Sequence, residues 1–60
     1  MKNTYYIVLD TGKMQKEVPA AGYFTTYGYR KAREVAHLCQ IEHYDEACNV
    51  ANQGLNERED

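Results

Sequence analysis

The stretch TYYIVLDTGKMQKEVP, residues 4–19, decides the fold that this sequence predicts. Residues 4–9 are rich in β-branched and aromatic side chains, which favour a strand. Residues 10–13 form a turn, in which the glycine supplies the positive φ that a tight turn needs. Residues 14–18 alternate apolar and polar side chains, and the proline that follows ends the second strand. The stretch therefore predicts an antiparallel β-hairpin.

Two registers of this hairpin are open. A three-residue loop with a glycine bulge pairs Leu9 with Lys13, whereas a four-residue loop pairs Leu9 with Met14. A slip of one residue moves every side chain to the other face of the sheet. In the second register the apolar side chains share one face: Tyr5, Ile7, Leu9, Met14 and Val18. This clustering favours the second register, and it leaves Tyr6 and Val8 on the other face as candidate contact residues.

An amphipathic helix is predicted from about Thr26 onward. Four apolar residues recur on one face at helical spacing: Ala32, Val35, Ala36 and Cys39. Charged and polar residues occupy the opposite face at the same spacing: Arg30, Arg33, Glu34 and His37. Thr25 and Thr26 are placed to cap the start of this helix. Residues 20–24 before it are expected to form a linker, with a brief extended piece at Tyr23 and Phe24.

A second helix is predicted over residues 44–53. Its apolar stripe repeats the spacing of the first: Tyr44, Ala47, Cys48 and Ala51. Asp45 and Glu46 suit the start of a helix, because carboxylates are favourable near its positive end. Gly54 is expected to stop the helix in the left-handed conformation, with Leu55 folding back as a hydrophobic contact.

The connection between the two helices, residues 40–43, contains neither Gly nor Pro. One long helix over residues 26–53 therefore remains an alternative, but the apolar stripe changes phase and favours two helices. Together the elements predict an α+β fold, in which an N-terminal antiparallel hairpin packs on one or two C-terminal helices. Residues 1–55 form a single domain, and residues 56–60 a frayed acidic tail.

The chain is short and its charge is uneven. A domain of 60 residues buries only about 60% of the surface that its unfolded chain exposes, which favours a homodimer or a stable complex with a larger partner. The net charge is −2, but residues 1–40 carry six cations and three anions, whereas residues 41–60 carry one cation and six anions. This polarity favours electrostatic contacts of two opposite kinds.

The expected location is the cytoplasm. No apolar run approaches the roughly 18 residues that span a bilayer, and the first residues do not form a secretory signal. Cys39 and Cys48 do not make a disulfide framework. In a reducing compartment both are expected to be small buried hydrophobes on the two apolar stripes.

The sequence predicts neither catalysis nor a cofactor. It contains no Ser, and its glycines do not have the spacing of a phosphate-binding loop. Cys39 with His37 or His43 is the one nucleophile and base available, but residues two apart on a helix point to different sides. These three residues and Cys48 are ligand types for zinc, yet their spacing does not match zinc-binding patterns. We therefore expect no metal site.

The segment GYFTTYGYRKAR, residues 22–33, places four aromatic rings and three cations in twelve residues. Tyr and Arg are enriched at protein contacts, and cations near the start of a helix oppose its dipole. The predicted function is a small non-catalytic module, a regulator or inhibitor that docks on a larger cytosolic protein in bacteria or their viruses. The expected partner-binding residues are Tyr6, Tyr27, Tyr29, Arg30, Lys31 and Arg33.

A nucleic-acid-binding accessory protein is the alternative. In that case Lys13 and Lys16 join the same cations, and Tyr23 joins the tyrosines as a stacking platform for a single strand. The acidic overall balance of the chain, with an isoelectric point of about 5.6, counts against this alternative. The large aromatic rings could also simply fill a core that is short of Leu and Ile.

Overall fold

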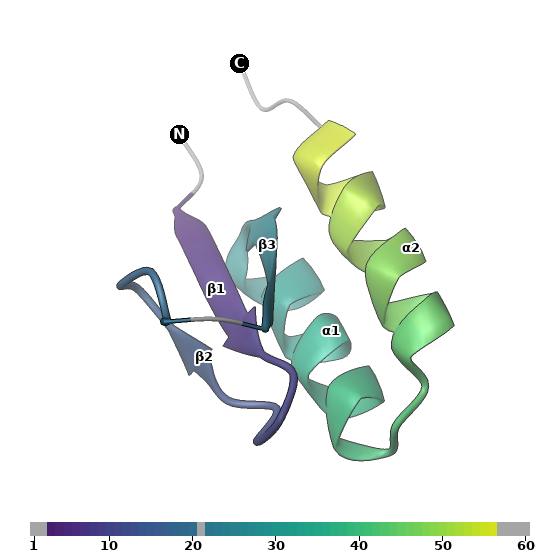
Figure 1. Ribbon diagram of the computed structural model, residues 1–60. Helices are drawn as coiled ribbons and strands as arrows, with labels where there is room; N and C mark the ends of the chain where they lie inside the picture. The colour runs from purple at the N-terminus through teal and green to yellow at the C-terminus, as the bar shows by residue number, and fades with distance from the viewer. Residues whose placement is uncertain (1–2, 21, 57–60) are drawn as a thin grey trace.

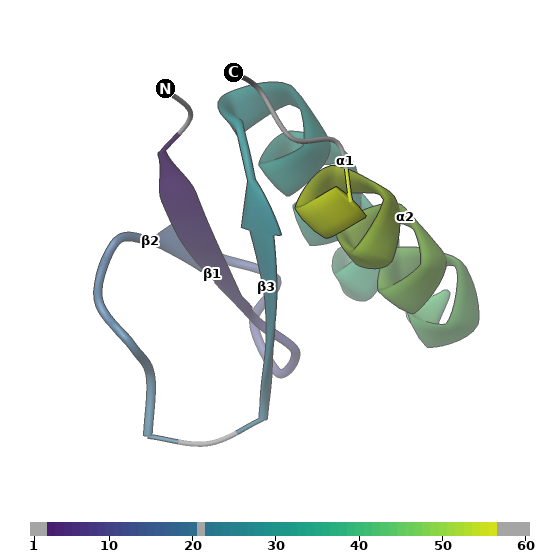
Figure 2. The ribbon, with the colours of Figure 1, turned by 90° about the horizontal axis from the view of Figure 1, so that it is seen from above.

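The computed structural model describes residues 3–20 and 22–56 and confirms the α+β class (Figure 1). Three strands precede two helices: β1 (Thr4–Val8), β2 (Met14–Gln15), β3 (Tyr23–Tyr27), α1 (Tyr29–Gln40) and α2 (Tyr44–Asn56). The strands form one antiparallel sheet in the order β2-β1-β3. Both helices lie on the same side of this sheet, as Figure 2 shows from above, so that its other face is open.

The third strand replaces the predicted linker. The extended piece predicted at Tyr23 and Phe24 is confirmed as the start of β3. The helix predicted from about Thr26 was wrong, because β3 pairs with the whole length of β1, from Thr4 opposite Tyr27 to Val8 opposite Tyr23. Tyr, Phe and Thr favour strands, and β1 gains a partner on each side. The helix starts later, after Gly28, and no side chain caps it.

The hairpin adopts neither predicted pairing. Ile7 lies opposite Met14. The Val8 N–H donates to the Lys13 carbonyl at 3.0 Å and closes the loop, so Leu9 lies within the loop. This register differs by two residues from the preferred one, and such a shift preserves the faces. The predicted inner face is therefore right for Tyr5, Ile7 and Met14, which pack in or against the core.

The second strand is shorter than predicted. It ends at Gln15 instead of continuing to Val18, whose side chain is 61% exposed and makes no part of the inner face. Lys16 and Glu17 follow as a bend, so the pattern of alternating apolar residues did not mark a paired strand there. β2 pairs with β1 through Tyr6 opposite Gln15 and Ile7 opposite Met14.

Gly12 seats the hairpin loop on the first helix. Its φ is +69°, its N–H donates to the Val8 carbonyl at 2.7 Å, and its own carbonyl accepts a bond from Gln40 Nε2 at 3.3 Å. A Cβ atom here would lie 3.0 Å from the Ala36 carbonyl oxygen and would meet the Gln40 side chain. Both the backbone conformation and the close approach therefore require glycine.

Small side chains make up most of the core. Its fully buried members come from β1 and both helices: Ile7, Ala32, Val35, Ala36, Cys39, Ala47 and Ala51. The predicted stripe of α1 is confirmed, because all four of its residues are buried. Alanine at so many core positions lets the two helices and the sheet approach closely.

Two helices are present instead of one long helix. The Ile41 N–H still bonds to the His37 carbonyl at 3.2 Å, but Glu42 adopts a positive φ of 61° and turns the chain. The His43 N–H then bonds back to the Leu38 carbonyl at 2.8 Å. The predicted connection is thus confirmed at Ile41 to His43. Gln40 still belongs to α1.

The predicted stop at Gly54 was wrong. Gly54 lies inside α2, is buried, and does not have a positive φ. A Cβ atom there would collide with the Thr26 hydroxyl and approach Lys31 Cβ at 3.2 Å. Gly54 is therefore a contact point between α2 and β3, and the helix continues to Asn56. Of the predicted frayed tail, Asn56 is helical, and residues 57–60 lie outside the described residues.

The two cysteines differ. Cys39 is buried as predicted, whereas Cys48 is exposed and the prediction for it was wrong. Tyr44, on the same predicted stripe, is 39% exposed. The buried face of α2 is rotated toward Ala47, Ala51 and Gly54. In the range 3–20 and 22–56, neither helix is long and apolar enough to cross a membrane.

Candidate binding surface

A hollow lies beside the start of α1, where α1 meets the ends of β1 and β3. Ten residues line it: Asn3, Tyr5, Tyr27, Gly28, Tyr29, Arg30, Lys31, Arg33, Glu34 and His37. Five of the six predicted partner-binding residues are among them. We call these ten residues, together with Lys16, the basic aromatic surface.

Two tyrosine rings and two cations form the centre of this surface. The rings of Tyr5 and Tyr29 meet edge to face, with their centroids 6.0 Å apart and their planes at 61°. Lys16 Nζ lies 4.9 Å from the centroid of the Tyr5 ring, and Arg33 Cζ lies 5.8 Å from that of Tyr29. Ring pairs and cation–π contacts of this geometry are attractive. The four side chains therefore hold one another in place.

Tyr5 ties this arrangement to the core. It is half-buried and packs against the core cluster from β1, whereas Tyr29 is 54% exposed on the first turn of α1. Tyr29 therefore rests against a ring that the fold holds in place. A contact side chain held in this way loses little conformational entropy when a partner binds.

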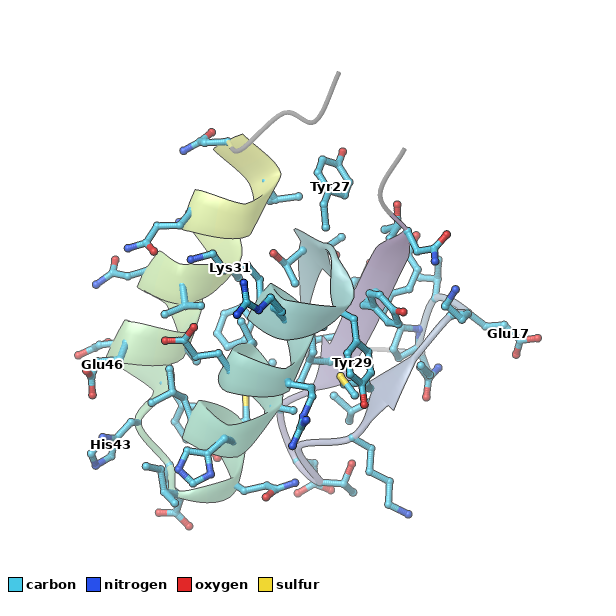
Figure 3. All side chains as sticks on the ribbon, turned by 180° about the vertical axis from the view of Figure 1, so that it is seen from behind. Glu17, Tyr27, Tyr29, Lys31, His43 and Glu46 are labelled. Atoms are coloured by element: carbon cyan, nitrogen blue, oxygen red, sulfur yellow. The ribbon has the colours of Figure 1, made fainter. Side chains whose placement is uncertain are left out.

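Lys31 connects the surface to the second helix. Its Nζ donates to Gln53 Oε1 of α2 at 3.3 Å. In Figure 3 Lys31 extends toward α2, while Tyr27 and Tyr29 lie well apart, above and below the first turn of α1. The ring of Tyr27 is 37% exposed at the end of β3. The two exposed tyrosines thus mark two ends of the surface.

Positive charge dominates the surface. Arg30, Lys31 and Arg33 line the hollow with one carboxylate, that of Glu34, and Lys16 adds a fourth cation at the Tyr5 ring. The first turn of α1 holds no acidic residue and no side-chain cap, so Arg30 and Lys31 lie where the helix dipole is itself positive. Stability would favour carboxylates at these positions. The surface is therefore suited to bind negative charge.

Tyr6 lies elsewhere. It projects from the open face of the sheet, where its ring meets that of Tyr23 edge to face at 5.7 Å and 75°. Val8 is on the same face and is half-buried. Lys13 lies opposite Val8, on the hairpin. The sheet thus separates Tyr6, Tyr23 and Lys13 from the basic aromatic surface, although the sequence grouped them with it.

Two members of the central group of rings and cations were not among the predicted partner-binding residues. Tyr5 was assigned to the inner face of the hairpin, and Lys16 only to a general cationic set. The contact of Tyr5 with Tyr29 depends on β3, which carries the chain back across the sheet and starts α1 beside β1, and Lys16 joins the pair through the Tyr5 ring. Alternation along β1 predicted that Tyr5 lies on the inner face of the sheet, but it did not predict that Tyr29 lies next to it.

Nucleophiles and metal-ligand types do not gather within residues 3–20 and 22–56. Burial raises the pKa of the Cys39 thiol above its ordinary value, which keeps it protonated, and its neighbour His37 is exposed. His43 Nδ1 lies 3.0 Å from Glu46 Oε1, and both side chains are exposed. Among the residues that the structure describes, no three His, Cys, Asp or Glu side chains are placed to hold a metal ion.

Comparison with known proteins adds no relative. No protein-family model matches the chain. No curated protein and no solved structure matches it either. The functional proposal therefore rests on the geometry and charge of the surfaces described above.

Proposed function

We propose that this chain is a non-catalytic binding module, which docks through its basic aromatic surface on an acidic patch of a larger cytoplasmic protein and thereby regulates or inhibits it. One observation carries the proposal: the Tyr5–Tyr29 ring pair with Lys16 at one end and Arg33 at the other. Tyrosine and arginine side chains held rigidly at the surface are the anchors that protein interfaces use most.

The same contacts favour a protein partner over a nucleic acid. A base stacks on a ring whose face is accessible. In the ring pair, a cation already lies near one face of each ring, and each ring's edge or other face meets the second ring. The tyrosine hydroxyls and the guanidinium groups remain suited to hydrogen bonds with carboxylates. The net charge of −2 also opposes general attraction to phosphates.

Charge reversal on the surface tests the proposal. The partner is first captured from cell lysate on the immobilised chain after nuclease treatment, identified, and purified. Its affinity is then measured for the unchanged chain, for Arg30→Glu and for Lys13→Glu. Both variants shift the net charge equally, but Lys13 lies on the hairpin, outside the hollow.

Arg30→Glu is expected to weaken the complex by about 1–4 kcal/mol, whereas Lys13→Glu leaves it within about 0.5 kcal/mol. Tyr29→Ala is expected to weaken it by a similar amount with little dependence on salt. Equal losses for Arg30→Glu and Lys13→Glu would show that net charge, and not this surface, drives binding.

Oligonucleotide titrations test the alternative. Fluorescent single- and double-stranded probes are mixed with the chain at low and at physiological salt. We expect no binding at micromolar protein. Binding at low salt that collapses at physiological salt, and that Lys31→Ala and Arg33→Ala weaken as much as Tyr29→Ala, would replace the protein partner by a nucleic acid.

Self-association remains a separate prediction from the thin core. Sedimentation velocity at tens of micromolar is expected to show a dimer, or a monomer that dimerises as the concentration rises. A strict monomer with high thermal stability would contradict it, since the core would then suffice alone.

A further inference from the structure

The two edges of the sheet are unlike. β2 contributes only two residues and is followed by Lys16, Glu17 and Pro19, a charged and proline-blocked border of the kind that prevents strand pairing. β3 is the opposite edge, with the sequence YFTTY. It carries no charge and no proline, and no described strand lies on its outer side. β3 therefore lacks the charges and the proline that protect the other edge, and its remaining protection is α2, which packs beside it.

The backbone groups on the outer side of β3 can be assigned. The Leu9 N–H bonds to the Gly22 carbonyl and the Gly28 N–H to the Asn3 carbonyl, both at 2.9 Å, so these pairs are hydrogen-bonded ones. Bonded and non-bonded pairs alternate in an antiparallel ladder. With the register of β1 and β3, the N–H and C=O groups that face away from β1 are those of Tyr23, Thr25 and Tyr27.

A fourth strand on this edge would meet α2. The second helix runs beside β3 (Figures 1 and 3), and the Thr26 hydroxyl donates to the Ala51 carbonyl at 3.1 Å. Three residues share a helix face with Ala51: Tyr44, Cys48 and Leu55. They are respectively 39% exposed, exposed and half-buried. The apolar surface of α2 therefore extends beyond the part that β3 buries.

The charge of α2 indicates what such a strand carries. The only charged side chains of α2 are Asp45 and Glu46, both exposed, and β3 is uncharged. A complementary strand would be apolar on the side toward α2 and would carry Lys or Arg near the first turn of that helix. A second copy of this chain would have to bring two more helices to the side of the sheet that α1 and α2 occupy, whereas an extended segment needs only the width of a strand.

We propose that the edge of β3 binds an extended, cationic segment of a partner protein as a fourth antiparallel or parallel strand, with its alternate apolar side chains on α2. This mode of recognition uses backbone hydrogen bonds for affinity and alternate side chains for specificity. Apart from Tyr27, whose backbone lies at the end of this edge, it uses residues outside the basic aromatic surface. Together the two surfaces let the chain join an acidic protein to a basic segment.

The first test uses the unmodified chain and a synthetic peptide, Lys-Val-Thr-Val-Thr-Val-Thr-Lys. Amide NMR shifts are followed during titration, and changes are expected at Tyr23 to Tyr27 and along α2, with a dissociation constant below about 1 mM. Replacing both peptide lysines by glutamate is expected to weaken binding about five-fold or more. Absence of binding to the lysine peptide at millimolar concentration would overturn the proposal.

N-methylated peptides locate the contact without changing the protein. Methylating alternate peptide nitrogens on one set of residues is expected to abolish binding, whereas methylating the other set leaves it within about two-fold, because only one set faces β3. An equal effect of both sets would overturn strand pairing. Peptide-induced dimers in sedimentation, or shifts confined to α1, would overturn it as well.

Thr25→Pro gives the matching change in the protein. It removes an outward N–H while leaving the bonds to β1 intact, as proline is tolerated on the solvent side of an edge strand. Thr25→Val, which keeps the N–H, is the control. Peptide binding is expected to fall about ten-fold or more in the first and to persist in the second. If Thr25→Pro does not fold, the N-methylated peptides decide. Arg30→Glu is expected to leave peptide binding unchanged, so failure here is distinguishable from failure of the proposed function.

Discussion

The seam between β3 and α2 and the basic aromatic surface are built in opposite ways. In the seam, Thr26 and Gly54 bring a strand and a helix into backbone contact, and no side chain larger than those present fits. On the basic aromatic surface, Tyr29 and Arg33 are long, exposed, and held only by each other and by Tyr5. The close packing of the seam requires that Gly54 has no side chain, whereas the basic aromatic surface is formed by long side chains.

This difference separates stability from binding. Substitutions in the seam are expected to change the free energy of unfolding, since they alter close packing. Substitutions on the basic aromatic surface are expected to change affinity with little effect on folding, because exposed ion and ring contacts contribute modestly. The following predictions test this separation, from the largest expected effect on stability to the smallest.

Gly54→Ala is expected to destabilise the protein by about 2–3 kcal/mol. On an exposed helix the same change stabilises by roughly 0.5–1 kcal/mol. Here the new Cβ would collide with the Thr26 hydroxyl and press on Lys31 Cβ, so α2 must move away from β3. Chemical denaturation followed by circular dichroism measures the change. Asn49→Ala, on the exposed side of the same helix, is the control and is expected to be neutral or slightly stabilising.

A stabilising Gly54→Ala would show that α2 does not approach β3 as closely as the structure has it. The seam would then resemble an ordinary helix surface, and the contrast with the basic aromatic surface would disappear.

Thr26→Val is expected to cost about 1–2 kcal/mol. Valine keeps the shape and the strand preference of threonine but removes the hydroxyl, which is fully buried and donates to the Ala51 carbonyl. Thr25→Val is the matched control, because Thr25 lies next in the same strand on the open face, and it is expected to change stability by less than about 0.5 kcal/mol. Equal effects at both positions would mean that the buried hydrogen bond contributes nothing.

Local patterns correctly predicted two helices after the hairpin, the buried face of α1 and the inner face of β1. The spacing of Ala32, Val35 and Cys39 gave the buried side of α1, because one helix face must meet the core whatever lies opposite. The phase change of the apolar stripe gave the break at Glu42. Alternation placed Ile7 inside even though the pairing was two residues off, since faces survive an even shift.

The wrong predictions concern residues whose contacts are distant in the sequence. Thr26 has the chemistry of a cap, but the carbonyl it bonds belongs to Ala51, 25 residues away. Gly54 has the chemistry of a helix stop, yet it serves a close approach that only the third strand creates. Cys48 fits the spacing of a buried stripe, but the direction from which β3 meets α2 leaves it exposed. None of these contacts is local in the sequence.

The candidate surface was predictable where it is continuous in the chain. Tyr27, Tyr29 and Arg33 line the same hollow because they span the end of one strand and the start of the next helix. Tyr5 and Lys16 join them from the hairpin, and Tyr6 does not, because adjacent residues of a strand face opposite sides. Alternation already separates Tyr5 from Tyr6, but the place of Tyr5 beside Tyr29 depends on the strand order.

The two cysteines give the smallest expected effect. Cys39→Ala removes a buried sulfur and is expected to destabilise by about 1 kcal/mol, whereas Cys48→Ala changes stability by less than about 0.5 kcal/mol. A thiol reagent at neutral pH is expected to label Cys48 alone in the folded chain and both residues in denaturant, as mass spectrometry would show. Rapid native labelling of Cys39 would contradict its burial.

Cys39 also makes a prediction about pH. Burial raises the pKa of its thiol, so the folded state favours the neutral form. Its contribution to folding is therefore complete below the ordinary pKa of a cysteine and is lost as the pH rises through the raised folded-state value. Denaturation of the unchanged chain at neutral and at alkaline pH, compared with Cys39→Ala, isolates this loss. The difference in stability between the two chains should shrink on the alkaline side, while Cys48→Ala should follow the unchanged chain throughout. A gap that stays constant would mean that the buried thiol does not ionise on unfolding.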